Sequence, residues 1–285
     1  MNRFLAAALV AVSLAGVAPD ADAQTARQAR QEVEASMLVT GHVDIDAGGG
    51  VIAHAVDEPG KLPPHVVALI DRFVPSMRFE PVTDASGSAP ARAKMALRLV
   101  ATPAGNGEMN MRIASAHFGD KRSEDDPSEV RAARMVPPRY PQEIAMMGGT
   151  GTVYLLIKVG RDGSAQDVVA EQVNLTALGT GSQMQTIRTR LAKAAIDAAK
   201  RWQFTPPTEG LEAERSYWVV RTPVTYSLDR AREPAYGTWG AYHPGPRTSP
   251  DWAAPTPEGF SPDAVAAGGL TPETSRYRLV TPLEG

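Results

Sequence analysis

The fold is decided by residues 201–206, Arg-Trp-Gln-Phe-Thr-Pro, which end an Ala-rich helical run and lead into a β-rich segment that closes at Leu228. A fainter copy, Ser-Met-Arg-Phe-Glu-Pro at 76–81, ends an earlier helical run. With their flanks, both copies describe one order of elements: strand, Gly turn, strand, helix, aromatic-Pro exit, strand. The chain is therefore predicted to be a tandem array of two small units.

The second unit has the clearer pattern. Apolar residues alternate over 152–159, which is typical of a mostly buried strand. A Gly-Arg-Asp-Gly turn at 160–163 leads into a second strand near 164–173. Apolar residues at helical spacing between 187 and 202 predict a helix with one buried stripe. The last strand is expected over residues 216–228.

The first unit repeats this order more faintly. Apolar alternation over 39–45 predicts a strand, and a triple-Gly turn follows it. A stripe over 66–77 predicts a helix that Pro75 ends or kinks. Further strands are expected over 94–100 and 109–118, joined by a Gly-Asn-Gly hairpin.

Two different offsets align the units. Matching the turns places Ile45 on Val159, whereas matching the helix exits places Phe79 on Phe204. The offsets differ by 11 residues, which we assign to an extra loop around residues 174–182.

The N-terminus predicts export. Residues 1–23 combine Arg3, an apolar run and a small-x-small cleavage pattern, as in a secretory signal peptide, so the mature chain is expected to start at Gln24. The apolar run is shorter than the ~20 residues that a spanning helix needs. The chain has no cysteine, which excludes disulfides and thiol chemistry, and its net charge of −3 does not favour nucleic acid as a partner.

Five segments are expected in an α+β fold of two tandem small antiparallel sheets, each with a packed helix. They are a signal peptide (1–23), a first domain (36–118), a linker (119–136), a second domain (137–228) and a tail (229–285). The tail has 9 Pro and 7 Gly in 57 residues, which is typical of irregular sequence. Since it also holds Trp239 and Trp252, part of it is expected to pack on a domain or to meet a partner.

Several features of the second unit occur in a specific order. They are Pro-Pro-Arg-Tyr-Pro at 137–141, Gly-Thr-Val at 151–153, Gly-Arg-Asp-Gly at 160–163, the helix exit at 201–206, and a last strand with an internal Pro at 219–228. In this order and spacing, residues 137–228 resemble the C-terminal domain of the TonB family. The first unit looks like a diverged copy, with Met77 where the second has Trp202.

The resemblance implies a periplasmic module that couples an inner-membrane motor to outer-membrane receptors in energy-driven transmembrane transport. Recognition in that family uses an extended receptor peptide laid along the sheet edge. Energy-transducing members have an N-terminal spanning helix and a long Pro-rich spacer. Here 13 residues, 24–36, separate the signal from the first strand and reach at most ~45 Å. If the signal is not cleaved, an inner-membrane anchor is expected instead.

The internal Pro marks the last strand as the sheet edge, because Pro has no N–H to give to a ladder. An exposed edge offers backbone groups to which an extended peptide can add. The candidate partner-binding residues are Tyr217, Val219, Arg221, Pro223 and Thr225. The alternative is that the tail covers this edge, or that Pro223 blunts it.

Five other residues are assigned to the structural motif: Tyr140, Pro141, Trp202, Phe204 and Pro206. Trp202 and Phe204 close the helix stripe that faces the sheet, so they are assigned to the core. Tyr140 either stacks on a partner or staples a short helix predicted over 142–147.

No catalytic residue, metal site or cofactor is predicted. The five histidines show no pair at metal-ligand spacing, and Gly-Thr-Gly-Ser at 179–182 lacks the order of a nucleophile elbow and is assigned to the extra loop. The predicted function is therefore protein binding, with a receptor peptide or another envelope protein as partner and with homodimerisation left open. The alternatives are an envelope scaffold or dimerising protein without energy transduction, and an enzyme of unknown class.

Overall fold

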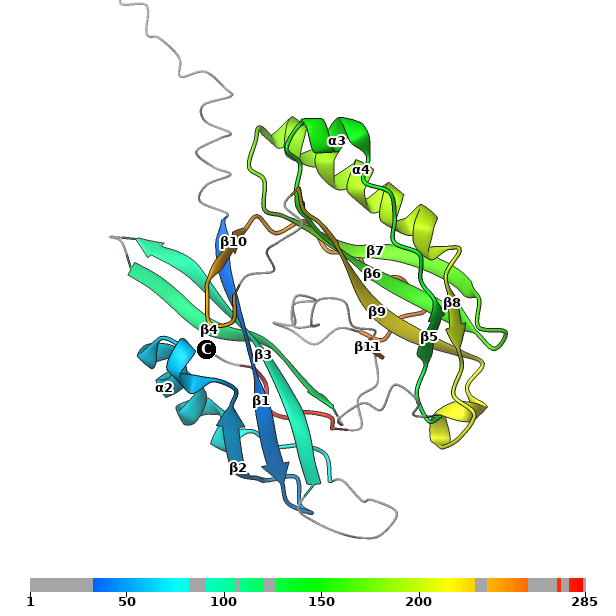
Figure 1. Ribbon diagram of the computed structural model, residues 1–285. Helices are drawn as coiled ribbons and strands as arrows, with labels where there is room; N and C mark the ends of the chain where they lie inside the picture. Colours follow the sequence, from blue (N-terminus) through cyan, green and yellow to red (C-terminus); the bar gives the residue numbers. More distant parts are fainter. Residues whose placement is uncertain are drawn as a thin grey trace, which may run out of the picture.

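Two antiparallel sheets, each with a helix packed on one face, make up most of the described chain (Figure 1). The structure is a computed structural model that describes residues 33–81, 91–105, 108–119, 127–228, 235–255, 271–272 and 277–283. The predicted signal peptide lies outside these ranges. Since the strands of both sheets pair antiparallel and each sheet carries a helix, the predicted α+β class is confirmed.

The first sheet is centred on β1, in the order β10-β1-β3-β4, with β2 also paired to β1. Its own elements are β1 (Glu34–Ile45), β2 (Val51–Val56), the 3-10 helix η1 (Pro59–Lys61), α2 (Pro64–Phe73), the 3-10 helix η2 (Val74–Ser76), β3 (Ala91–Gly105) and β4 (Glu108–Gly119). Val66 and Ile70 of α2 are fully buried in one hydrophobic cluster with side chains of β1 and β3. Pro75 lies in η2, so the α-helix ends before it, as the sequence predicts.

The second sheet has the order β11-β9-β6-β7, and α4 covers one of its faces (Figure 1). The elements of this unit are β5 (Arg131–Arg134), α3 (Gln142–Met146), β6 (Gly151–Gly160), β7 (Ala165–Leu175), α4 (Gly181–Ala199), β8 (Gln203–Thr205), the 3-10 helix η3 (Leu211–Glu214) and β9 (Tyr217–Tyr226). Val153, Leu155 and Ile157 of β6 are buried in one cluster with Leu191 and Ala195 of α4. The alternation in the sequence therefore identifies the core face of this sheet.

The loop before α4 is shorter than the sequence predicts. The predicted loop spans 174–182, but β7 continues to Leu175 and α4 begins at Gly181. The helix begins early because Thr180 and Gln183 form a capping box, in which each side chain accepts from the backbone N–H of the other. The Gly-Thr-Gly-Ser run is therefore a helix N-terminus, which corrects its assignment to the loop.

Both units contain one contact between the Gly turn and the aromatic exit. Gly163 has φ +75°, and its carbonyl accepts from the Phe204 N–H at 2.8 Å. Gly49 has φ +84°, and its carbonyl accepts from the Phe79 N–H at 2.8 Å. A Cβ at either glycine would overlap with the carbonyl oxygen of the partner Phe. Both turns therefore need glycine, for the left-handed φ and for the close approach of two backbones.

A strand lies inside the range that the sequence assigns to a linker. β5 pairs antiparallel with β8, with Ala132 opposite Phe204. Val130 is buried in the hydrophobic cluster of the second sheet, and the Pro127 carbonyl accepts from the Thr208 N–H at 2.8 Å. From residue 127 onward, this segment packs on the second unit.

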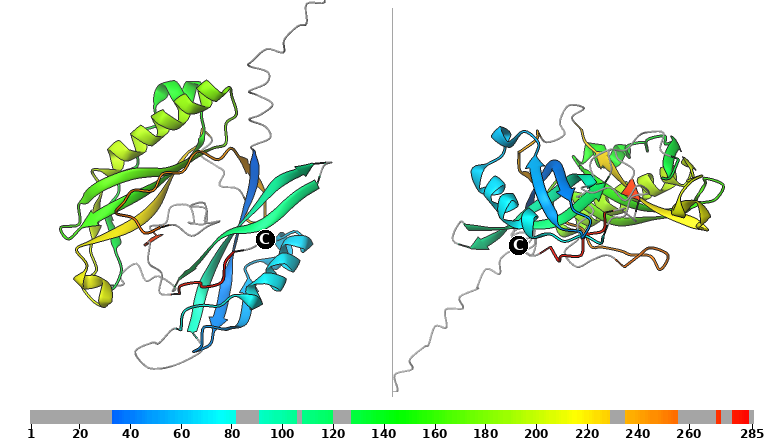
Figure 2. Two further views of the ribbon diagram at one scale, coloured as in Figure 1. Left: turned by 180° about the vertical axis from the view of Figure 1, so that it is seen from behind. Right: turned by 90° about the horizontal axis from the view of Figure 1, so that it is seen from below.

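The tail contacts both sheets. Trp239 packs against the hydrophobic cluster of the first sheet, and β10 (Gly240–Tyr242) pairs with the start of β1. The next residue, His243, forms an antiparallel bridge with Leu175 of β7. Figure 2 shows this segment crossing from one sheet to the other.

The end of the chain returns to each sheet once more. β11 (Thr271–Pro272) pairs with β9 of the second sheet. Further on, Tyr277 is buried in the cluster of the first sheet, and Leu279 forms an antiparallel bridge with Phe79. Within the described ranges, no helix is both long enough and apolar enough to span a membrane.

Candidate functional site

The last strand of the second unit, β9, is one of the two edge strands of that unit's sheet, and β7 is the other. β9 pairs with β6 over ten consecutive positions, from Tyr217 opposite Gly160 to Tyr226 opposite Gly151. Its other side carries β11, a strand of two residues from the tail. Within the unit 137–228, β9 is therefore an edge strand, as Pro223 predicts. Pro223 itself lies opposite Tyr154 of β6.

One face of β9 belongs to the helix-covered core. Trp218, Val220, Val224 and Tyr226 are buried there. The indole N–H of Trp218 donates to the Glu212 carbonyl of η3 at 2.9 Å, so its polar group is satisfied inside the unit. This face is structural and offers no side chain to a partner.

The predicted partner-binding residues lie on the opposite face and differ in exposure. Val219, Arg221 and Pro223 are buried, Tyr217 is half-buried and Thr225 is exposed. A partner on the outer edge would therefore meet the β9 backbone and the exposed Thr225, because three of the five side chains are already covered.

Tyr217 joins the start of β9 to the tail. Its hydroxyl donates to the Trp252 carbonyl at 3.2 Å, and its ring lies under the ammonium of Lys158, 4.4 Å from the ring centroid. The indole N–H of Trp252 donates to Asp167 of β7 at 2.9 Å. The tail segment at Trp252 is therefore bonded to two strands of the second sheet.

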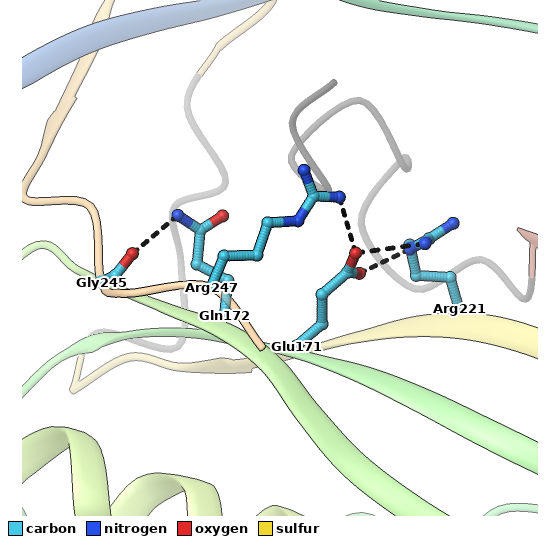
Figure 3. Close-up of polar contacts among 5 residues, drawn as sticks. All are labelled: Glu171, Gln172, Arg221, Gly245 and Arg247. Atoms are coloured by element: carbon cyan, nitrogen blue, oxygen red, sulfur yellow. Dashed lines mark hydrogen bonds and ion pairs between the residues drawn. The ribbon is translucent and has the colours of Figure 1, made fainter. Parts of the chain in front are cut away.

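A buried cluster of charges lies on the same face of the sheet (Figure 3). Glu171 of β7 is fully buried, and its carboxylate accepts from Arg221 Nε at 2.5 Å and from Arg221 Nη2 at 3.1 Å. Arg247 of the tail donates to the same carboxylate at 2.7 Å, with 29% of its side chain exposed. This charge clamp, Glu171 with Arg221 and Arg247, therefore connects β7, β9 and the tail through one buried anion.

A bulge in β7 orients Glu171. The register of β7 on β6 shifts at this point: Gln172 lies opposite Tyr154, and Ala170 lies opposite Leu155. The extra residue is Glu171, and its carbonyl accepts from the Thr248 N–H of the tail at 2.8 Å. Bulges often re-aim a side chain next to a functional edge, and here the bulge exposes a backbone carbonyl to the tail.

The tail also covers the outer edge of β7. Leu175 and His243 exchange two backbone hydrogen bonds, at 3.0 and 2.8 Å. The Gln172 side-chain amide donates to the Gly245 carbonyl at 2.9 Å (Figure 3). Arg188 of α4 donates to the carbonyls of His243 and Pro244, at 3.3 and 3.1 Å. Residues 243–248 are thus held to this edge by backbone and side-chain bonds.

The residues assigned to the structural motif hold the ends of the two helices. The Trp202 indole N–H donates to the Val136 carbonyl at 2.8 Å, and Trp202 and Phe204 are both buried in the core. Pro206 follows them and is half-buried. Pro141 is the N-cap of α3.

Tyr140 connects α3 to the sheet. Its hydroxyl donates to the Gly149 carbonyl at 2.6 Å, and its ring packs edge-on against Tyr226 with a centroid distance of 5.2 Å. Burial raises the pKa of the Tyr140 hydroxyl. The pKa of Tyr226 is also raised, mainly by burial and further by Tyr140. In this geometry Tyr140 staples the short helix.

Sequence reasoning missed the residues that reach this site from elsewhere: Glu171, Arg247, Thr271 and Pro272. One signal was present, because the charged Glu171 directly follows the apolar residues 168–170 within a predicted strand. The three tail residues carry no periodicity. Among the described residues, no group of three or more His, Asp or Glu side chains could hold a metal ion.

Part of the chain is similar in sequence to known proteins. Two curated relatives, each described as "Protein TonB" and both from Xanthomonas campestris pv. campestris (strain B100 and a second strain), are 28% identical to it over 102 residues. The match covers 35% of this chain and 39% of each relative, so the chain spans about two fifths of the relatives' length.

A solved structure, described as the solution NMR structure of Pseudomonas aeruginosa TonB CTD, is 21% identical. It matches with a TM-score of 0.23 and covers 37% of this chain and 92% of that one. No family model matches the sequence. The weak sequence similarity to the two relatives, over about a third of the chain, supports a TonB-like domain.

Proposed function

We propose that the chain is a periplasmic TonB-like protein-binding module. Its partner is an extended peptide of an outer-membrane receptor, or of another envelope protein, that adds as a strand to the outer edge of β9. One observation carries the proposal: this edge already accepts an antiparallel strand, β11, at Val220 and Arg221. The similarity to proteins described as TonB supports the same role.

Recognition at this edge would rest mainly on the backbone. An added strand gains affinity from main-chain hydrogen bonds and selectivity from alternate side chains. Since Val219, Arg221 and Pro223 are buried, Thr225 and the half-buried Tyr217 are the predicted residues that remain within reach. The proposal assigns no catalytic step. The buried Glu171 carboxylate already forms ion pairs with the guanidinium groups of Arg221 and Arg247.

The first unit is proposed to be a diverged copy of the second. The support is the shared contact between turn and exit, in which Gly49 bonds to Phe79 as Gly163 bonds to Phe204. In each unit a bridge follows directly after the glycine: Gly50 pairs with the residue before Phe79, and Ser164 with the residue before Phe204.

Export to the periplasm is inferred from the N-terminal sequence pattern, and energy coupling would require that residues 1–23 are retained as a membrane anchor. Mass spectrometry of the native N-terminus tests this directly. A chain that starts at Gln24 is expected, which fits an accessory module. A chain that retains residues 1–23 would instead support an inner-membrane anchored energy transducer.

Site-specific photo-crosslinking in cells tests the edge. A photoreactive residue at the exposed Thr225 is expected to form an adduct with an outer-membrane receptor or another envelope protein, at one extended segment mapped by mass spectrometry. The matched control is the exposed Gln185 on α4, which lies on another element of the same unit. No adduct at Thr225, or the same adducts at both positions, would rule out recognition at β9.

A further inference from the structure

The tail places a strand where the proposed partner would bind. Thr271 lies opposite Arg221 and Pro272 opposite Val220, antiparallel to β9 and on the side away from β6. Figure 1 shows β11 beside β9. The edge of the TonB-like unit is thus occupied by a segment of the same chain, about 50 residues further along.

This internal pairing is short. β6 pairs with β9 at ten positions, whereas β11 pairs with it at two. Pro272 also has no N–H to donate to a ladder. A longer extended peptide could therefore make more backbone hydrogen bonds along β9 than β11 does, and it could displace β11 without disturbing β6.

The tail is anchored on both sides of β11, which keeps this short strand near the edge. Before it, His243 and Thr248 are bonded to the backbone of β7. After it, the backbone N–H groups of Val280 and Thr281 donate to the Arg78 carbonyl of the first unit, at 2.8 and 3.3 Å. A tethered segment competes at a high effective concentration even when its own affinity is small.

Arg221 connects β11 to the rest of the tail. Its backbone lies opposite Thr271, and its side chain bonds to the buried Glu171. Glu171 in turn bonds to Arg247 of the tail and, through its carbonyl, to the Thr248 N–H (Figure 3). The charge clamp therefore fixes an earlier tail segment to the same residue that β11 covers.

We propose that Thr271 and Pro272 form an internal competitor of the β9 edge. The partner peptide pairs with the backbone of β9 on the side that β11 occupies, and it binds only after displacing β11. This inference rests on the proposed function, because it places a competing segment of the same chain at the edge where the partner binds.

A peptide that copies the tail tests the competitor without an identified partner. The probe is a fluorescein-labelled synthetic peptide with the sequence of residues 266–275, added in trans to the full chain. The variant is Thr271→Pro, which leaves β11 without any backbone N–H and leaves β9 unchanged. The matched control is Pro272→Ala, which adds an N–H to β11. Since β11 pairs with β9 at only two positions, both variants are expected to keep a melting temperature close to that of the wild type.

Fluorescence anisotropy should show tighter binding of the probe to Thr271→Pro than to wild type. If β11 occupies the edge in nine of ten molecules, the gain in affinity is about tenfold. Pro272→Ala should bind the probe no more tightly than wild type, and a scrambled peptide should bind to none of them. Equal affinity for wild type and Thr271→Pro, or no binding to either, would overturn the internal competitor.

Crosslinking at Thr225 in the Thr271→Pro background separates the two proposals. A higher yield of the envelope adduct than in wild type supports both. An equal yield in both backgrounds supports the function and contradicts the competitor. If the probe binds as predicted but no envelope adduct forms in either background, the competitor stands and the proposed function fails.

Discussion

Glu171 of β7 and Arg221 of β9 form a two-point ion pair across the second sheet, with β6 between their strands. Both side chains are almost fully buried, at 0% and 7% exposed. A buried charge that loses its partner is strongly destabilising, because no water replaces the lost bonds. The pair therefore fixes the relative position of two strands that are not neighbours in the sheet, and through Arg247 it also holds the tail.

Removing the Glu171 carboxylate should lower the free energy of unfolding more than removing the Arg247 guanidinium does. Glu171→Ala removes the buried carboxylate that Arg221 and Arg247 share and is expected to lower the free energy of unfolding by about 3–5 kcal/mol. Arg247→Ala leaves the inner pair intact and is expected to cost about 1–2 kcal/mol. Urea unfolding of both variants measures the difference.

The control for this pair of variants is Arg190→Ala, whose partner Glu143 is 3.9 Å away in an exposed pair. Its expected cost is below about 0.5 kcal/mol. An equal loss from Glu171→Ala and Arg247→Ala would contradict the central role given to the buried anion.

The turn glycines should respond to alanine according to what surrounds them. Gly163 and Gly148 both have a left-handed φ, +75° and +72°, but only at Gly163 would a Cβ meet another backbone. Gly148→Ala is expected to cost about 1–2 kcal/mol from φ alone. Gly163→Ala should cost at least about 2 kcal/mol more, because the turn must separate from Phe204.

Gly49→Ala is expected to destabilise the fold as much as Gly163→Ala does, since Gly49 approaches the backbone of Phe79 as closely as Gly163 approaches that of Phe204. Thermal unfolding monitored by circular dichroism measures all three variants. If Gly49→Ala behaves like Gly148→Ala, the two turns are not equivalent, and the main structural support for a duplicated unit is lost.

Tyr242 should make the stability of the tail contact pH-dependent. Burial, helped by the hydrogen bond to Glu34, raises the pKa of the Tyr242 hydroxyl. A group with a raised folded-state pKa stabilises the fold fully below its unfolded pKa, here ~10, and this contribution is lost as the pH rises above that value.

Tyr242→Phe is therefore expected to cost about 1–2 kcal/mol at pH 7, through the lost hydrogen bond to a carboxylate. Above pH 10 the wild-type protein should lose stability more steeply than the variant, so the difference between them should shrink. Urea unfolding at pH 7, 9, 10 and 11 checks this, and parallel stability curves across that range would contradict it.

The fold of each unit could be predicted because its signals are local. Alternation marks β6, helical spacing marks α4, and Pro75 marks the end of α2. The bounds of α4 differ from the prediction because the capping box at Thr180 depends on two side chains rather than on apolar periodicity.

The occupation of the edge could not be predicted in the same way. β10 and β11 have three and two residues, which is too short for any periodic pattern, and their partners lie far away in the sequence. The bonds of Glu171 depend on the bulge that sets the register of β7. Cover of this edge by the tail is one of the alternatives that the sequence leaves open, and only the tertiary arrangement decides between them.

Amide hydrogen exchange on the Thr271→Pro chain, with and without the peptide of residues 266–275, tests the central claim most directly. Strand addition at the outer edge of β9 predicts slower exchange within residues 217–226 when the peptide is present, and no change in β4, the strand at the far end of the first sheet. Unchanged exchange in β9, or protection that appears in β4 instead, would contradict the account.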